Sequence, residues 1–168
     1  EYLGFSARKW DRSGAELRQT IINSWLEYDV TADVAITNAG GIRSSISAGE
    51  ISLGSVVSML PFSNTIIATQ LSGRVLQRAL EQGGRPVFAG LTEVNGEWIV
   101  RRTGKALTDD GLYRVLINSF MYDGGDDFGM VAEFDPNGFD MDTNYREPFV
   151  QWLKRQNTSP ASPLHLAY

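Results

Sequence analysis

Cysteine and histidine are almost missing from this 168-residue sequence, which has no cysteine and one histidine, His165. Without cysteine there are no disulfides and no thiolate metal ligands, and a single imidazole cannot form a multi-histidine metal centre. No serine elbow or other partnered nucleophile accompanies His165, so acid–base or triad chemistry lacks the groups that it needs. We therefore expect His165 to be structural or exposed.

Long apolar runs and an excess of basic residues are also missing. No stretch approaches the roughly 20 apolar residues of a membrane span, and residues 1–4 are not typical of a signal peptide. The sequence begins without methionine, so we expect a processed product or an excised domain. The formal net charge is −5. Because a basic field supplies most non-specific affinity for polymeric nucleic acid, we expect no nucleic-acid polymer as a partner.

Phosphate-cradling motifs are missing as well. There is neither a Walker-type lysine loop nor a Gly-x-Gly-x-x-Gly strand–helix fingerprint, so we expect no cofactor in this chain. The residues that are present, 42% hydrophobic and 21% charged, are typical of a globular protein. At this length we expect one domain, residues 1–168, that buries roughly 70% of its unfolded surface.

Helical and strand patterns alternate along the chain. Apolar side chains at spacings of three and four predict helices, and short β-branched runs bounded by turn residues predict strands. The predicted helices cover 14–28, 53–59, 73–83 and about 145–155, and the predicted strands cover 33–37, 65–71, 87–94, 97–100 and 113–117. Residues typical of helix starts are Ser52, Ser72 and Pro148.

Two further local patterns have a physical basis. Asn95 and Gly96 readily adopt the positive φ angles of a tight turn, which predicts a hairpin between strands 87–94 and 97–100. The tail after residue 157 is rich in serine and proline and predicts irregular structure, although 164–166 is expected to add a short edge strand.

Three loops combine backbone freedom with side chains that suit ligand binding. In the first, residues 38–43, two glycines allow close approach of the backbone, and Asn38 and Arg43 offer hydrogen-bonding groups for an oxygen-rich ligand. The alternative is a plain Gly-Gly turn in which Asn38 bonds its own backbone and Arg43 is solvated.

The other two loops each carry an aromatic ring, Phe62 after Pro61 and Phe120 beside a glycine-rich turn. Two such rings can sandwich a planar base, and each base–aromatic stack is worth roughly 1–3 kcal/mol. The alternative is that both rings are core residues that close one end of a sheet, because phenylalanine is usually buried.

Three aspartates, Asp123, Asp126 and Asp127, crowd the glycine-rich turn that follows Phe120. One carboxylate there suits the vicinal hydroxyls of a ribose, a role that acidic residues have in dinucleotide folds. The oxygen-ligand spacing of a calcium loop is not found, so we expect no metal at this turn.

Together, three motifs of this sequence resemble the C-terminal domain of the 5′-nucleotidase family. They are ADVAITNAGGIR at 32–43, LPFSNT at 60–65, and NSFMYDGGDDF at 118–128. Their order and spacing make the set much more specific than any one motif, and the resemblance covers about residues 14–155. It implies an α+β fold in which helices flank a mixed β-sheet, with the core over about 14–155.

The resemblance also implies a two-domain enzyme. Its N-terminal metallophosphoesterase domain, absent from this chain, would hold two divalent metals and a catalytic His–Asp pair. This chain would bind the base and ribose of a nucleotide, which the partner domain hydrolyses to nucleoside and phosphate. On that basis we expect the isolated chain to be inactive, with no catalytic or metal-binding residue of its own, and the full protein to be periplasmic or extracellular.

Matching the motifs residue by residue assigns roles to seven positions. The resemblance implies that the base stacks between Phe62 and Phe120, that Asp126 binds the ribose, that Asn38, Gly40 and Arg43 contact base or phosphate, and that Gly90 lines the base pocket. A stand-alone nucleoside-binding or interaction module without catalysis is the alternative. Within the enzyme class, UDP-sugar and 2′,3′-cyclic nucleotide substrates also stay open.

The sequence departs from the family at two places. The first helix has Leu-Arg-Gln-Thr at 17–20, where the family has a Leu-Gly-Asn-Leu run preceded by a phosphate-binding arginine. Arg8 or Arg12 is the candidate for that arginine. The family's glycine after the ribose-binding aspartate is Asp127 here, so a positive φ at this position would strain the loop.

Overall fold

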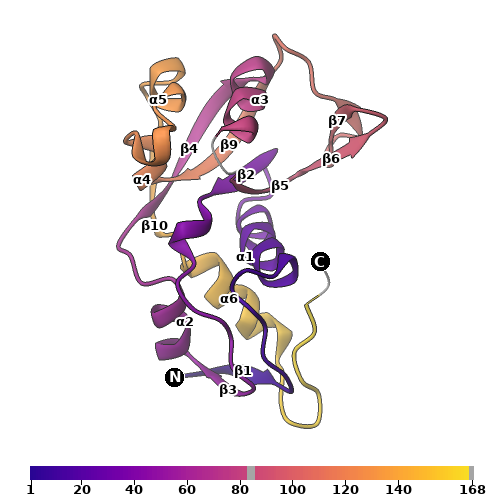
Figure 1. Cartoon of the computed structure of the whole chain (residues 1–168), viewed down its shortest axis with the longest axis vertical. Helices are drawn as coiled ribbons and strands as arrows, with labels where there is room; N and C mark the ends of the chain where they lie inside the picture. Colours follow the sequence, from indigo (N-terminus) through magenta and orange to yellow (C-terminus); the bar gives the residue numbers. More distant parts are fainter. Residues whose placement is uncertain (83–85, 167–168) are drawn as a thin grey trace.

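A computed structural model, which describes residues 1–82 and 86–166, has a five-stranded mixed sheet at its centre (Figure 1). From one edge to the other the strands are β10 (Phe139–Asn144), β4 (Thr65–Ser72), β9 (Leu112–Asn118), β2 (Val34–Thr37) and β5 (Val87–Ala89). Strands β2 and β9 are parallel, and the other neighbours are antiparallel. The expected α+β fold with a mixed sheet is confirmed.

Side chains of the central strands alternate between two apolar layers, as the period of a β-strand requires. In β2, Ala35 faces one layer and Val34 and Ile36 face the other. In β9, Leu116 faces the first layer and Ile117 the second. The sheet is therefore covered on both faces, and only the ends and edges of its strands are open for a site.

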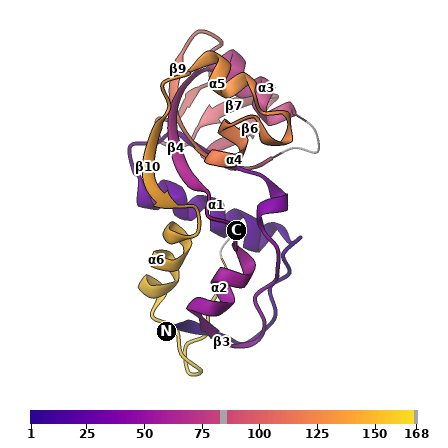
Figure 2. The same cartoon turned by 90° about the vertical axis from the view of Figure 1, so that its left-hand side faces the viewer.

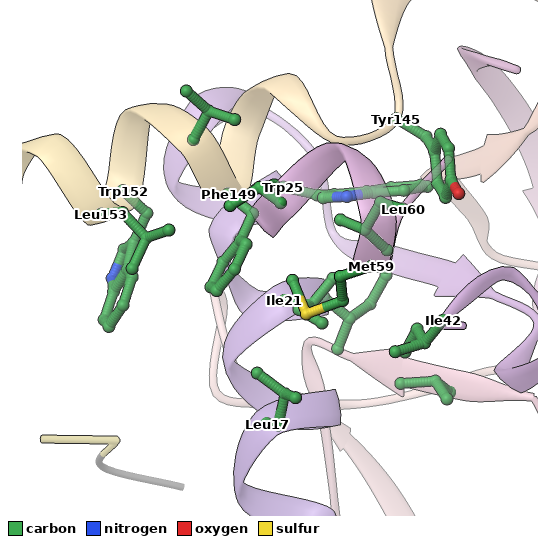
Figure 3. Close-up of a cluster of buried hydrophobic side chains, with 14 of the residues drawn as sticks. Leu17, Ile21, Trp25, Ile42, Met59, Leu60, Tyr145, Phe149, Trp152 and Leu153 are labelled. Atoms are coloured by element: carbon green, nitrogen blue, oxygen red, sulfur yellow. The ribbon is translucent and has the colours of Figure 1, made fainter. Parts of the chain in front are cut away.

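Three helices supply the first layer: α1 (Ala15–Tyr28), α2 (Leu53–Met59) and α6 (Glu147–Gln156). Figure 3 shows Trp25 of α1, Met59 at the end of α2, and Phe149 of α6 within this cluster. Trp25 and Phe149 are both fully buried. Tyr145, which precedes α6, lies at one edge of the same cluster and is 3% exposed.

The second layer is formed by α3 (Gly73–Glu81), α5 (Met130–Phe134) and a hairpin of β6 (Leu91–Val94) and β7 (Glu97–Val100). The hairpin projects from the body of the molecule beside α3 (Figure 1). Strand β8 (Lys105–Ala106) extends it, and Trp98 packs edge-on against Phe88 with ring centroids 5.5 Å apart.

The first residues of the chain are part of the first layer and lie at the far end of the molecule from α3 and α5 (Figures 1 and 2). Strand β1 (Tyr2–Ser6) pairs with β3 (Gly49–Ser52) in a separate two-stranded sheet. Leu3 and Leu164 are each 3% exposed within the cluster, so the apolar core is longer than the expected 14–155.

Most predicted elements are confirmed at or near their expected limits. Helix α2 begins at Leu53 with the predicted cap, because the Ser52 hydroxyl accepts a hydrogen bond from the Ser55 N–H at 3.1 Å. Ser72 caps α3 in the same way, through the Val75 N–H at 3.2 Å. The predicted end of that helix at Gly83 lies outside the described residues.

Three predictions are wrong or incomplete. The predicted strand 87–94 is two strands, β5 and β6, because Gly90 at φ 103° turns the chain between them. Residues 164–166 form no strand, although the Leu164 N–H donates to the Phe5 carbonyl at 2.8 Å. Strands β1, β3, β8 and β10 and helix α5 are short and were not predicted.

Two aspartates between α1 and β2 form ion pairs and hydrogen bonds that link neighbouring elements. Asp33 Oδ1 accepts hydrogen bonds from Arg102 Nη2 and Nε at 2.6 and 2.9 Å, and Oδ2 accepts the Arg114 N–H at 2.9 Å. Asp29 Oδ2 accepts from Arg114 Nη2 at 2.7 Å. Burial raises the pKa of Asp29, but hydrogen bonds from Thr31 and Arg114 outweigh burial and hold the pKa below its ordinary value of 3.8.

No helix in the described part of the chain is long and apolar enough to cross a membrane.

The lowered pKa makes the Asp29 contribution depend on pH. A carboxylate with a folded-state pKa below its unfolded value stabilises the fold above the unfolded pKa, and this contribution is lost as pH falls through the folded pKa. Asp29→Asn should therefore be less stable than wild type at neutral pH, with the difference narrowing below about pH 4. Urea unfolding at several pH values measures this. Arg114→Gln should show the same narrowing, and a constant difference at every pH would contradict the assignment.

Candidate functional site

A cavity of about 280 Å³ opens at one end of the central sheet. Its lining residues come from loops that are far apart in the sequence and include four asparagine or aspartate side chains and three aromatic rings. They are Asn38, Gly40, Gly41, Phe62, Asn64, Asn118, Phe120, Asp126 and Tyr145. Of the seven residues predicted for the site, five line this cavity.

The direction of the strands explains why these loops meet. Asn38 follows β2 and Asn118 ends β9, and the two strands are parallel, so their carboxyl ends lie at the same edge. Strand β4 is antiparallel to β9 and pairs Ile66 with Asn118, which brings its first residues, and Asn64 just before them, to that edge. Ligand sites in α/β sheets commonly form at such strand ends.

Phe62 and Phe120 both line the cavity, and each is 43% exposed. Phe62 is in the loop between α2 and β4, whereas Phe120 is on the short helix α4 (Ser119–Tyr122). Both rings are therefore too exposed to be core residues that close the sheet end. Exposed aromatic rings beside a cavity are suited to stacking on a planar ligand.

Gly125 allows the Phe120 ring to occupy its position. A Cβ atom added to Gly125 would lie 2.5–2.6 Å from three ring carbons of Phe120, well inside van der Waals contact. Gly125 belongs to the 3₁₀ turn η2 (Gly125–Asp127), so the glycine-rich loop packs directly against the ring. The absence of a side chain at Gly125 is thus a packing requirement of the site.

Asn118 fixes the orientation of the Asn38 amide. Its Nδ2 donates to Asn38 Oδ1 at 2.8 Å and to Thr37 Oγ1 at 2.9 Å, and its Oδ1 accepts the Met121 N–H at 2.9 Å. Asn118 is 2% exposed, so these bonds satisfy a buried amide. The bond from Asn118 uses one of the two lone pairs of Asn38 Oδ1, so Asn38 can offer its Nδ2 donors and the second lone pair to a ligand.

Ser119 and Tyr145 tie the remaining loops together. Ser119 Oγ accepts hydrogen bonds from Asn64 Nδ2 at 3.2 Å and from the Thr65 N–H at 3.1 Å. The Tyr145 hydroxyl donates to the Gly41 carbonyl at 2.9 Å and accepts the Phe62 N–H at 3.4 Å. Burial raises the pKa of Tyr145, so its hydroxyl is protonated and able to donate at neutral pH.

Sequence reasoning missed Gly41, Asn64, Asn118 and Tyr145 as lining residues. Asn64 and Asn118 fall inside the motifs that were singled out, and Asn118 also has the position of a helix cap, which is a usable signal. Tyr145 has no such signal, because it lies outside those motifs and reaches the cavity only through the packing of α6.

Asp126 lines the cavity and its neighbour Asp127 does not. Both have positive φ angles, 56° for Asp126 and 64° for Asp127. The positive φ expected at Asp127 is therefore present, in a residue type that adopts this region more easily than most but less easily than glycine. The loop that presents Asp126 is strained at two consecutive residues.

The predicted arginines lie outside the cavity. Arg43 is exposed and does not line it; burial raises the pKa of Tyr145, which does line the cavity, and the charge of Arg43 only partly opposes that rise in pKa. Arg12 Nη1 donates to the Arg43 carbonyl at 3.3 Å and so lies beside Arg43. Arg8 instead pairs with Glu16 at 3.1 Å.

Gly90, which the resemblance assigns to the base pocket, does not line this cavity. It lies near the start of β2, where a Cβ atom would come within 2.1 Å of the Asp33 carbonyl oxygen. Asn38 follows the opposite end of the same strand. Gly90 is needed for the turn between β5 and β6 and for this close backbone approach.

Comparison with known proteins connects these features with one family. The family model described as "5'-nucleotidase, C-terminal domain" matches residues 4–133. The trifunctional nucleotide phosphoesterase protein YfkN of Bacillus subtilis is 34% identical over 146 residues, which cover 74% of this chain and 10% of that protein. A 5′-nucleotidase of Vibrio vulnificus is 34% identical over 133 residues, covering 70% of this chain and 24% of that protein.

A solved structure shares the fold over nearly the whole chain. The crystal structure of a 5′-nucleotidase precursor from Thermus thermophilus aligns with a TM-score of 0.80 at 25% identity. The alignment covers 98% of this chain and 38% of that one. This chain thus spans a quarter or less of the two curated relatives and well under half of the solved structure.

Relief of backbone strain at Asp127 is directly testable. Asp127→Gly should raise the free energy of unfolding by up to about 1 kcal/mol, because glycine adopts positive φ without a steric cost. For a chain of this size that corresponds to a melting temperature about 2–4 °C higher. Asp123→Gly is the matched control, since Asp123 is an exposed aspartate of the same loop with φ −76°. Its melting temperature should fall, and a fall in both variants would contradict the strain.

Proposed function

The chain belongs to the 5′-nucleotidase C-terminal domain family, and on that premise we propose that it binds the base and ribose of a nucleotide. Hydrolysis of the phosphate ester to nucleoside and phosphate is assigned to a separate, metal-bearing domain of the same protein. The cavity at the end of the central sheet is the proposed nucleoside site. The proposal also places the full-length protein in the periplasm or outside the cell, in keeping with the family resemblance.

The observation that carries the proposal is that Phe62 and Phe120 line one and the same cavity. Each ring comes from a different loop, and each leaves 43% of its surface exposed, although exposed phenylalanine is unfavourable in water. A planar base between the rings would cover this surface on both sides. The cavity volume of about 280 Å³ is close to the lower limit for small-molecule sites.

The polar lining gives the base and the sugar separate partners. Asn38 offers its Nδ2 donors, while its Oδ1 already accepts one hydrogen bond from Asn118. Asn64 donates through Nδ2 to Ser119, which leaves its Oδ1 as an acceptor for the ligand. A donor and an acceptor together suit the edge of a nucleobase. Asp126, on the other loop, is exposed and suits two vicinal hydroxyls of a ribose.

Two observations support a separate catalytic domain. The chain spans 10% of one curated relative and 24% of another, so each of those proteins has extensive sequence beyond the matched region. Within residues 1–82 and 86–166, no group of three or more His, Asp or Glu side chains is placed to hold a metal ion. Arg43, and Arg12 whose Nη1 donates to the Arg43 carbonyl, are the proposed contacts for the phosphate.

Removal of either ring tests the proposed stack. Phe62→Ala or Phe120→Ala should weaken adenosine or AMP binding by about 1–3 kcal/mol, the contribution of one base–aromatic stack. Isothermal titration calorimetry with the 168-residue protein measures this directly.

Phe134→Ala is the matched control for both ring variants. Phe134 is 44% exposed, almost the same as the two cavity rings, and it does not line the cavity. Its substitution should leave the affinity unchanged. If both cavity variants fold and bind like wild type, the rings are structural and the proposed site is wrong.

Catalytic inactivity of the isolated chain is a second test. The purified protein should release no phosphate from AMP with added divalent metal ions, because the proposed metals belong to the other domain. Metal-dependent release that a chelator abolishes would show a catalytic centre within this chain.

The sequence of the full-length protein distinguishes the proposed hydrolase from a module that only binds nucleosides. An upstream region with Asp-x-His and Gly-Asn-His-Glu-like metal motifs in the full-length protein supports hydrolysis by a partner domain. A full-length protein without such motifs would leave a stand-alone nucleoside-binding or interaction module. UDP-sugar and 2′,3′-cyclic nucleotide substrates are distinguished by assaying that full-length protein.

A further inference from the structure

We infer that Tyr145 is a positioning residue whose hydroxyl sets the place of the Phe62 loop relative to the Asn38 loop. The inference rests on the proposed nucleoside site and assigns a specificity role within it. Tyr145 reaches the cavity from a segment that follows the residues 4–133 matched by the family model.

Asn144 and Tyr145 form hydrogen bonds with backbone groups of the Phe62 loop, the loop between α2 and β4. Asn144 Nδ2 donates to the Phe62 carbonyl at 3.2 Å, and the Tyr145 N–H donates to the Asn64 carbonyl at 2.9 Å. The Phe62 N–H donates in turn to the Tyr145 hydroxyl at 3.4 Å. Both backbone polar groups of Phe62 are therefore bound by neighbouring residues of one segment, which fixes the direction in which the exposed ring points.

The same hydroxyl reaches the first loop. It donates to the Gly41 carbonyl at 2.9 Å. Gly41 is in turn bonded to Asn38, because the Gly41 N–H donates to the Asn38 carbonyl at 3.0 Å. A shift of Gly41 would thus displace Asn38 as well. One oxygen atom connects the position of a stacking ring with that of a base-binding amide.

The anchor of this hydroxyl is rigid. The Tyr145 ring is 3% exposed and packs in the apolar cluster with α1, α2 and α6 (Figure 3). Because the core packing holds the ring, the ring keeps its position when only the hydroxyl is removed. Loss of the oxygen alone therefore frees the two loops from each other while the core packing is retained.

Tyr145→Phe tests the inference because it removes the oxygen and keeps the ring. Tyr113→Phe is the matched control, since the Tyr113 hydroxyl also accepts a backbone N–H, that of Thr108 at 2.8 Å, near the opposite end of β9. Each variant is titrated with adenosine by calorimetry and melted without ligand. Amide hydrogen exchange at Phe62 is measured in the ligand-free proteins.

We expect Tyr145→Phe to raise the Kd for adenosine about three- to tenfold, because both hydrogen bonds of the hydroxyl are lost and part of that loss reaches the site, and to accelerate exchange at Phe62. Tyr113→Phe should lower the melting temperature without changing either quantity. If wild type binds and Phe62→Ala weakens binding, an unchanged Kd in Tyr145→Phe overturns the inference and leaves the proposed function intact. If wild type does not bind adenosine, the proposed function fails, and exchange at Phe62 alone decides whether Tyr145 positions the loop.

Discussion

Three loops at one end of the sheet are tied to one another by buried or half-buried polar side chains. Asn118 joins the Asn38 loop to the start of α4, and Ser119 joins α4 to Asn64 of the Phe62 loop. Tyr145 joins the Phe62 loop to the Asn38 loop. Each loop is therefore held by the other two. The ties hold the loops that carry Phe62 and Phe120, and both rings stay 43% exposed, although burial of apolar surface is favourable.

This arrangement follows from how the sheet is covered. Helices and the hairpin occupy both faces, so no face is free for a ligand. At the ends of β2 and β9 the backbone leaves the ladder and its polar groups need other partners. Side-chain amides and hydroxyls provide those partners and at the same time shape the cavity. Backbone strain at Asp126 and Asp127 lies at the same place, where a ligand-binding turn commonly carries it.

The end of β2 that lies away from the cavity has paired charges, which the described residues at the cavity end do not. There Asp33 and Asp29 are fully engaged with the guanidinium groups of Arg102 and Arg114, and Gly90 lets two backbones approach closely. Its charges are paired within the protein, and the segment serves to attach the hairpin. At the cavity, by contrast, the bonds to Asn118 and Ser119 use only part of the hydrogen-bonding capacity of the Asn38 and Asn64 amides. The two ends of one short strand are thus divided between a structural role and the proposed binding site.

The sequence by itself determined the helices and longer strands, because apolar periodicity and capping residues act over a few neighbours. It also determined three motifs, and with them Phe62, Phe120, Asp126, Asn38 and Gly40, since these belong to the loops that follow or precede predictable strands. Tertiary structure alone decided that Gly90 lies elsewhere and that Tyr145 belongs to the cavity. Strand register and helix packing set those two positions, and both depend on contacts between residues that are far apart in the chain.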